Sequence, residues 1–122
     1  MMWEGIDQRK FPRVNHKCRI TVSRAGEDEM IEADTENIGI GGICVVTEKK
    51  FELFETVSIK LQLGGDEKPV ECDGTICWVV GRHPSAPYEE MAYDVGIEFQ
   101  DIADEDRGRI GRLVENILAG RP

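Results

Sequence analysis

Two arginines near the N-terminus, Arg9 and Arg13, are the side chains best suited to bind a ligand. Each guanidinium can form paired hydrogen bonds to a phosphate or to the O6 and N7 edge of guanine, and it can stack on a purine face. Pro12 limits the backbone freedom between the two arginines, and Lys10 adds a third positive charge. The pattern predicts a stiffened arm that grips a compact anion. A solvated charged arm is the alternative, because this spacing is common.

The distribution of charge supports an anion site in this segment. The chain has a net charge of −9, from 15 Lys and Arg against 24 Asp and Glu, yet residues 8–26 contain no acid. A general DNA- or RNA-binding protein normally needs a broadly basic face, so the overall acidity argues against both partners. A local positive island on an acidic protein instead suits a small anionic ligand.

A second candidate for binding is the glycine-rich stretch 37–42, Asn-Ile-Gly-Ile-Gly-Gly. Gly39, Gly41 and Gly42 allow a backbone to approach a ligand closely, and the amide of Asn37 can contact a base edge. An ordinary turn between two strands is the alternative interpretation.

The sequence contains no arrangement typical of catalysis or of metal binding. It lacks a nucleophile elbow, a zinc-protease pair, a phosphate-binding loop and a dinucleotide fingerprint. The four cysteines are scattered without a Cys-x-x-Cys pair, which favours reduced, buried thiols in a cytosolic chain. We therefore expect a binding protein that is not an enzyme and that holds no metal or cofactor.

Alternating apolar and polar residues predict an all-β body that positions these groups. Gly74 is expected to mark a bend or bulge, because it interrupts a long run. Helical spacing follows over 104–118, with Asp101 or Asp104 as the N-cap. Six antiparallel strands with short turns close most readily into a small barrel or a tightly curled sandwich. We expect a six-stranded antiparallel β-barrel with one docked C-terminal α-helix. The six expected strands cover residues 14–22, 30–38, 42–47, 57–63, 70–80 and 91–99.

The length of 122 residues indicates a single domain. We expect it to span 8–118, with the arm at 8–13, the barrel at 14–99 and the helix at 104–118. Residues 1–7 and 119–122 are expected to be flexible ends. No apolar run approaches the ~20 residues of a membrane span, and the N-terminus lacks a basic and then apolar leader. These observations predict a cytoplasmic protein without membrane insertion.

Four motifs, in order, resemble the PilZ domain, a bacterial family that binds cyclic diguanylate (cyclic di-GMP). The Arg-x-x-x-Arg motif matches 9–13, and Asp/Asn-x-Ser-x-x-Gly matches 37–42. Residues 74–78, Gly-Thr-Ile-Cys-Trp, are similar to the family's Gly-x-Val-x-Trp strand, and 93–99, Tyr-Asp-Val-Gly-Ile-Glu-Phe, are similar to its last strand. The resemblance covers residues 8–118.

The resemblance implies a role for each matched residue. Arg9 and Arg13 would hold the phosphates and guanine edges of the nucleotide, with Lys10 adding charge. Asn37 and the backbone of Gly39, Gly41 and Gly42 would form the opposing wall. Trp78 either borders the pocket or fills the core, and its alternation with Ile76 and Val80 favours the core.

Two departures from the family pattern predict weaker binding. Gly39 stands where the family usually has serine, and Asn37 is the uncharged of the two residues allowed at its position. A neutral hydrogen bond contributes about 0.5–1.5 kcal/mol and a charged one about 1.5–3 kcal/mol. Losing hydrogen bonds of this strength corresponds to an affinity for the nucleotide reduced by roughly tenfold to a hundredfold.

The function implied by the resemblance is a stand-alone receptor or adaptor. Cyclic di-GMP would draw the arm onto the barrel, and the reshaped surface would contact an unidentified output protein. The alternative is a PilZ-like protein–protein interaction module without a ligand, acting in motility or surface-appendage assembly, and Gly39 motivates it. A small hydrolase of cyclic nucleotides is a remote third reading. A monomer or a homodimer is expected.

Overall fold

The computed structural model describes residues 13–16, 18–24, 30–48, 50–64, 68–82 and 91–120. Within these ranges seven strands precede one helix. The elements are β1 (Arg13–Asn15), β2 (Arg19–Arg24), β3 (Met30–Gly39), β4 (Gly42–Thr47), β5 (Thr56–Gln62), β6 (Val70–Arg82), β7 (Ala92–Gln100) and α1 (Asp104–Leu118).

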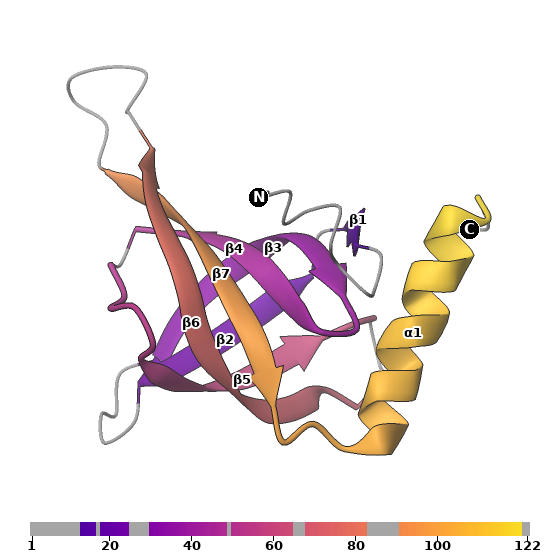
Figure 1. The fold of residues 1–122 in the computed structure, drawn as a ribbon. Coiled ribbons are helices and arrows are strands. Elements are labelled where there is room, and N and C mark those ends of the chain that lie inside the picture. The colour runs from indigo at the N-terminus through magenta and orange to yellow at the C-terminus, as the bar shows by residue number, and fades with distance from the viewer. Residues whose placement is uncertain are drawn as a thin grey trace, which may run out of the picture.

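Six of the described strands pair in a ring, and every pairing is antiparallel. Strand β2 pairs with β3, β3 with β4, β4 with β7, β7 with β6, β6 with β5, and β5 again with β2. The remaining strand, β1, pairs with the end of β3. The expected mainly β barrel with one C-terminal helix is confirmed, with seven strands instead of six (Figure 1).

The extra strand arises because the expected first strand, 14–22, is divided into β1 and β2. Both parts pair with β3, but the chain leaves the ladder between them. The buried Thr35 side chain compensates there: its hydroxyl donates to the His16 carbonyl at 2.6 Å and accepts from the Cys18 amide at 2.9 Å. Backbone groups that leave a ladder inside a protein need such partners.

The barrel interior is filled by alternating apolar side chains. In β5, Val57, Ile59 and Leu61 are buried while the intervening residues are exposed, so the predicted period of two is observed. The helix closes one side of the barrel near β1 and β3 (Figure 1) and adds Ile110 and Val114 to the same core. Its apolar stripe therefore provides the tertiary packing that stabilises it.

The start of α1 differs from the expected cap. Ala103 is the N-cap and has no side-chain capping hydrogen bond, so the prediction of Asp101 or Asp104 was wrong. Three acids in the first turn, residues 104–106, complement the positive end of the helix dipole.

Strand β6 contains a register shift between Ile76 and Trp78, so the bulge lies at Cys77. A bend or bulge was expected at Gly74, and the bulge part of that prediction was wrong. The extra residue reverses the alternation beyond it. Ile76 is buried, Val79 packs against the core, and Trp78 is on the outer face with 36% of its surface exposed. The prediction that Trp78 fills the core was therefore wrong, because sequence alternation cannot reveal an inserted residue.

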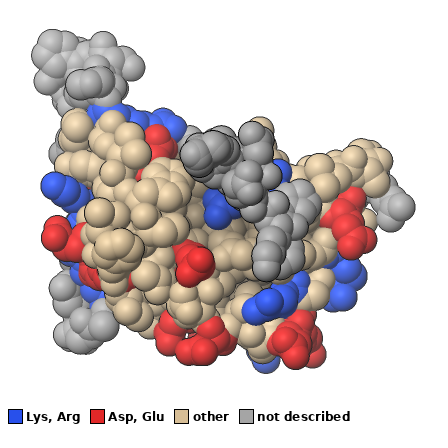
Figure 2. All heavy atoms as spheres, viewed as in Figure 1, with Lys and Arg blue, Asp and Glu red and all other residues tan. Residues whose placement is uncertain are grey.

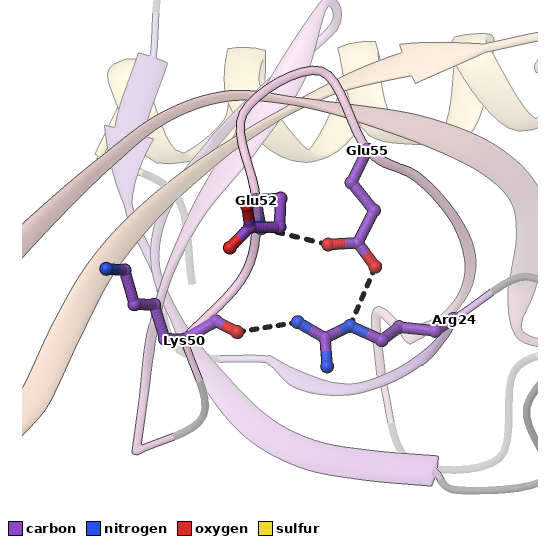
Figure 3. A network of polar contacts seen from close by, with 4 residues as sticks. All are labelled: Arg24, Lys50, Glu52 and Glu55. Carbon is purple, nitrogen blue, oxygen red and sulfur yellow. Dashed lines mark hydrogen bonds and ion pairs between the residues drawn. The ribbon is translucent and has the colours of Figure 1, made fainter.

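The connection between β4 and β5 is held by a polar network around Arg24 (Figure 3). The Arg24 guanidinium donates to the Lys50 carbonyl at 2.6 Å, lies 2.7 Å from a Glu55 carboxylate oxygen, and lies over the ring of Phe51 at 4.9 Å. The Glu55 carboxylate also accepts from the Glu52 amide at 2.9 Å. These contacts define one conformation for a loop that joins two barrel strands.

Candidate ligand-binding site

The candidate site lies on the outer face of the barrel, where strand pairing aligns two rows of residues. In the first row Arg13 of β1 is the register partner of Gly39 in β3, and Gly42 of β4 is the partner of Glu98 in β7. Glu98 in turn pairs with Thr75 of β6. Gly39 and Gly42 flank a two-residue turn, and the turn joins the two pairings into one row. The row has a basic residue at one end, two glycines in the middle and an acid toward the other end.

The second row lies one pleat away and crosses the same strands. Asn15 pairs with Asn37, Asn37 with Cys44, Cys44 with Gly96, and Gly96 with Trp78. Cys44 and Gly96 are buried but are small, while Trp78 is partly exposed. The two rows together make a shallow floor of small residues with polar and aromatic side chains at its sides.

Two glycines of this floor allow long side chains to lie directly on the sheet. A Cβ at Gly42 would overlap the Ile97 carbonyl oxygen and would lie 3.2 Å from a terminal nitrogen of Arg13, so the guanidinium lies over Gly42. A Cβ at Gly96 would lie 2.6 Å from Cδ1 of Trp78 and closer to two other indole atoms. The absence of side chains here therefore positions Arg13 and Trp78.

Arg13 is also oriented by Asn37. Its Nη1 donates to the Asn37 Oδ1 at 3.2 Å in a partly buried environment. A guanidinium is a planar fork of five donors, and the bond to Asn37 orients one of them. The pair thus connects the two motifs, 9–13 and 37–42, that the sequence separates by more than twenty residues.

Cys77, in the β6 bulge, lies close enough to Arg13 and Glu98 of the first row for their charges to affect it. Cys77 is an exposed residue, but partial burial of its thiol raises the pKa, the Glu98 carboxylate raises it further, and Arg13 partly offsets the increase. The thiol donates to the Gly96 carbonyl at 3.3 Å. Cys77 is thereby kept neutral, which is unlike the thiolate of a nucleophilic cysteine.

The structure brings together five of the eight residues predicted for the site: Arg13, Asn37, Gly39, Gly42 and Trp78. Gly41 occupies the turn after β3, where its carbonyl accepts from the Phe99 amide at 3.0 Å, so it braces the turn against β7. Arg9 and Lys10 lie outside the described residues.

Sequence reasoning missed Glu98, Gly96 and Cys44 as members of this surface. Alternation along residues 93–99 placed Glu98 outward, but it could not indicate which part of the outer face lies next to Arg13. Only the pairing of β4 with β7 provides that information.

Figure 2 shows acidic and basic side chains interspersed over the face drawn there. Among the residues that the structure describes, no group of three His, Cys, Asp or Glu side chains could hold a metal ion. Within the described ranges, no helix combines the length and the apolar character needed to cross a lipid bilayer.

Comparison with known proteins identifies the fold. A family model for the PilZ domain matches residues 7–116. The Bacillus subtilis inhibitor of motility, MotI/DgrA, superposes with a TM-score of 0.73 at 20% identity, over 93% of this chain and 53% of that one. The PilZ domain of Escherichia coli YcgR with c-di-GMP gives a TM-score of 0.71 at 10% identity, over 93% of each chain.

A third structure is the K. pneumonia MrkH–c-di-GMP complex, with a TM-score of 0.73 at 16% identity over 93% of this chain and 53% of that one. The present chain thus spans about half the length of the MotI and MrkH chains that it resembles. No curated protein matches it by sequence. At these identities the structural likeness establishes the fold.

Proposed function

The chain belongs to the PilZ domain family, and from this premise we propose that it is a receptor for cyclic di-GMP that acts on a partner protein. The observation that carries the proposal is the Arg13 guanidinium, held over Gly42 and hydrogen-bonded to Asn37. An oriented guanidinium over a glycine is suited to a phosphate or to a guanine edge.

The other side chains of the floor suit a nucleotide base. The Trp78 indole rests against Gly96 on the outer face, and a base stacked on an aromatic ring contributes about 1–3 kcal/mol. In this proposal Arg9 and Lys10 add charge from the preceding arm. Closure of that arm over the ligand would reshape the surface available to an output protein.

Gly39 reduces the expected affinity without removing the main attraction. It is the register partner of Arg13, so a serine here would add a hydroxyl to the same row of residues. Its absence removes one neutral hydrogen bond, worth about 0.5–1.5 kcal/mol. The charged contacts of the arginines contribute more, and binding is expected to persist.

Calorimetric titration of the purified protein with cyclic di-GMP tests the proposal, with cyclic di-AMP and GTP as ligand controls. Arg13→Ala should weaken binding by roughly tenfold to a hundredfold, the equivalent of one charged hydrogen bond. Arg107→Ala, at an exposed position in α1, is the matched control and should leave affinity unchanged. Circular dichroism verifies that each variant is folded.

Two results would contradict the proposal in different ways. A folded wild-type protein that gives no heat at high ligand concentration would exclude the receptor function. Unchanged affinity in an Arg9→Ala, Arg13→Ala double variant would exclude the assigned site. Chromatography of the ligand after several hours should recover it intact, because a receptor has no turnover.

A ligand-free interaction module is the second candidate, and the β4–β5 loop favours it. Phe54 is 76% exposed and Leu53 is 56% exposed at the tip of that loop, an arrangement that offers two apolar side chains to a partner. Under this function cyclic di-GMP would not change the unfolding temperature. A rise in that temperature that saturates with ligand would favour the receptor.

A further inference from the structure

Glu98 places a negative charge beside the proposed anion site. It is exposed on β7 and pairs directly with Gly42, over which the Arg13 guanidinium lies. Neighbouring strands are about 4.8 Å apart, so the carboxylate is one strand away from the backbone beneath that guanidinium. A carboxylate here repels a phosphate, but it would attract a part of the ligand that offers hydrogen-bond donors.

The carboxylate is oriented, since Gln100 Nε2 donates to its Oε1 at 2.9 Å. Gln100 lies two residues further along the same strand. Such a contact restricts the rotation of the Glu98 side chain and leaves acceptor capacity on both oxygens.

Gly96, which lies beneath the Trp78 indole, and Glu98 are successive outward-facing residues of β7. Trp78 is the register partner of Gly96, and Glu98 is the next residue of β7 on the same face. Two residues of a strand span about 6.7 Å, close to the width of a purine. A base stacked on the indole could therefore direct one edge toward Glu98.

We propose that Glu98 accepts hydrogen bonds from the Watson–Crick edge of a guanine and so selects guanine over adenine, an inference that rests on the proposed function. That edge of guanine carries two adjacent donors, N1–H and the 2-amino group, which match the two oxygens of a carboxylate. Adenine has an acceptor at N1 and cannot form this pair. Glu98 thus acts as a specificity residue beside Arg13, which contacts the phosphate.

The direction in which one substitution changes the affinity distinguishes this role from that of a solvated surface acid. If Glu98 only repels the phosphates, Glu98→Gln should tighten the binding of every cyclic dinucleotide. If it reads guanine, the same change should weaken cyclic di-GMP by roughly tenfold to a hundredfold, because charged hydrogen bonds are replaced by a mismatched amide.

The experiment compares wild type, Glu98→Gln and the control Glu105→Gln, an exposed acid in α1, by calorimetry. The ligands are cyclic di-GMP and its cyclic di-inosine analogue, which lacks the 2-amino groups. We expect wild type to prefer cyclic di-GMP, Glu98→Gln to lose most of that preference, and Glu105→Gln to retain it.

Equal or tighter binding of cyclic di-GMP by Glu98→Gln overturns the inference and leaves the proposed function intact. A folded wild-type protein that binds neither ligand overturns the proposed function itself. Thermal unfolding of all three proteins excludes misfolding as the cause of any loss.

Discussion

Replacing Gly96 with alanine should displace the indole of Trp78 from the sheet. The new Cβ would lie 2.6 Å from Cδ1 of the ring and closer to two other ring atoms, whereas carbon atoms normally pack at about 3.5–4.0 Å. Gly96 is held by ladders to β4 and β6, so its backbone cannot retreat. The ring is on the outer face and is the part that can move.

The size of the effect follows from the surface that the indole now covers. Trp78 is 36% exposed, so most of its surface is in contact with the protein. A buried tryptophan covers roughly 150–250 Å², and swinging outward would expose about 50–80 Å² of the covered part. At about 25 cal/mol per Å² this costs about 1–2 kcal/mol. For a domain of this length the unfolding temperature should fall by about 4–8 °C.

Urea unfolding followed by far-ultraviolet circular dichroism measures this cost in four proteins: wild type, Gly96→Ala, Trp78→Ala and the double variant. Since the overlap is with the indole, Gly96→Ala should cost almost nothing once Trp78 is removed. An equal loss in both backgrounds would refute the reasoning, because it would locate the overlap elsewhere.

Three further substitutions test the packing and the electrostatics. Gly74→Ala places a Cβ 2.6 Å from the side chains of both Ile59 and Ile97, so urea unfolding should show a loss of about 1–3 kcal/mol, and an unchanged midpoint would contradict this packing. Phe54 has a φ of 65° and is largely exposed. Phe54→Gly should relieve the backbone strain, so the free energy of unfolding should stay equal or rise by up to about 1 kcal/mol. A clear fall in that free energy would mean that the ring packs against the protein. Burial raises the pKa of the Cys72 thiol to about 11, and nearby carboxylates add to the increase. The folded state therefore holds the thiol proton more tightly than the unfolded state does. The resulting contribution to stability is complete below the ordinary thiol pKa and is lost as the pH rises through about 11. The stability difference between wild type and Cys72→Ala should therefore decline from pH 9 to pH 11, and a difference that does not change with pH would argue against the raised pKa.

Local periodicity was sufficient to predict most elements of this protein. The apolar stripe from 104 to 118 predicted a helix with the bounds of α1, and alternation predicted a strand over 57–63, where Val57, Ile59 and Leu61 are buried. Both patterns follow from backbone geometry, with 3.6 residues per turn in a helix and two per repeat in a strand. The order of motifs was likewise enough to indicate the PilZ family, which the family model matches.

The features that the sequence did not reveal depend on contacts between distant segments. The break between β1 and β2 depends on the Thr35 hydroxyl, which satisfies the backbone of residues almost twenty positions away. The face occupied by Trp78 depends on one inserted residue, Cys77, whose presence in a bulge is visible only in the pairing with β7.

The membership of the candidate site was decided in the same way. Arg13, Asn37, Gly42 and Glu98 belong to four strands, and only the registers of β1 with β3, of β3 with β4 and of β4 with β7 align them on one surface. The polar and apolar residues next to a residue in the sequence indicate which face of the sheet its side chain is on. Which residues it meets on that face is determined by long-range hydrogen bonding, because a change of register by two residues keeps every side chain on its face while giving it new neighbours.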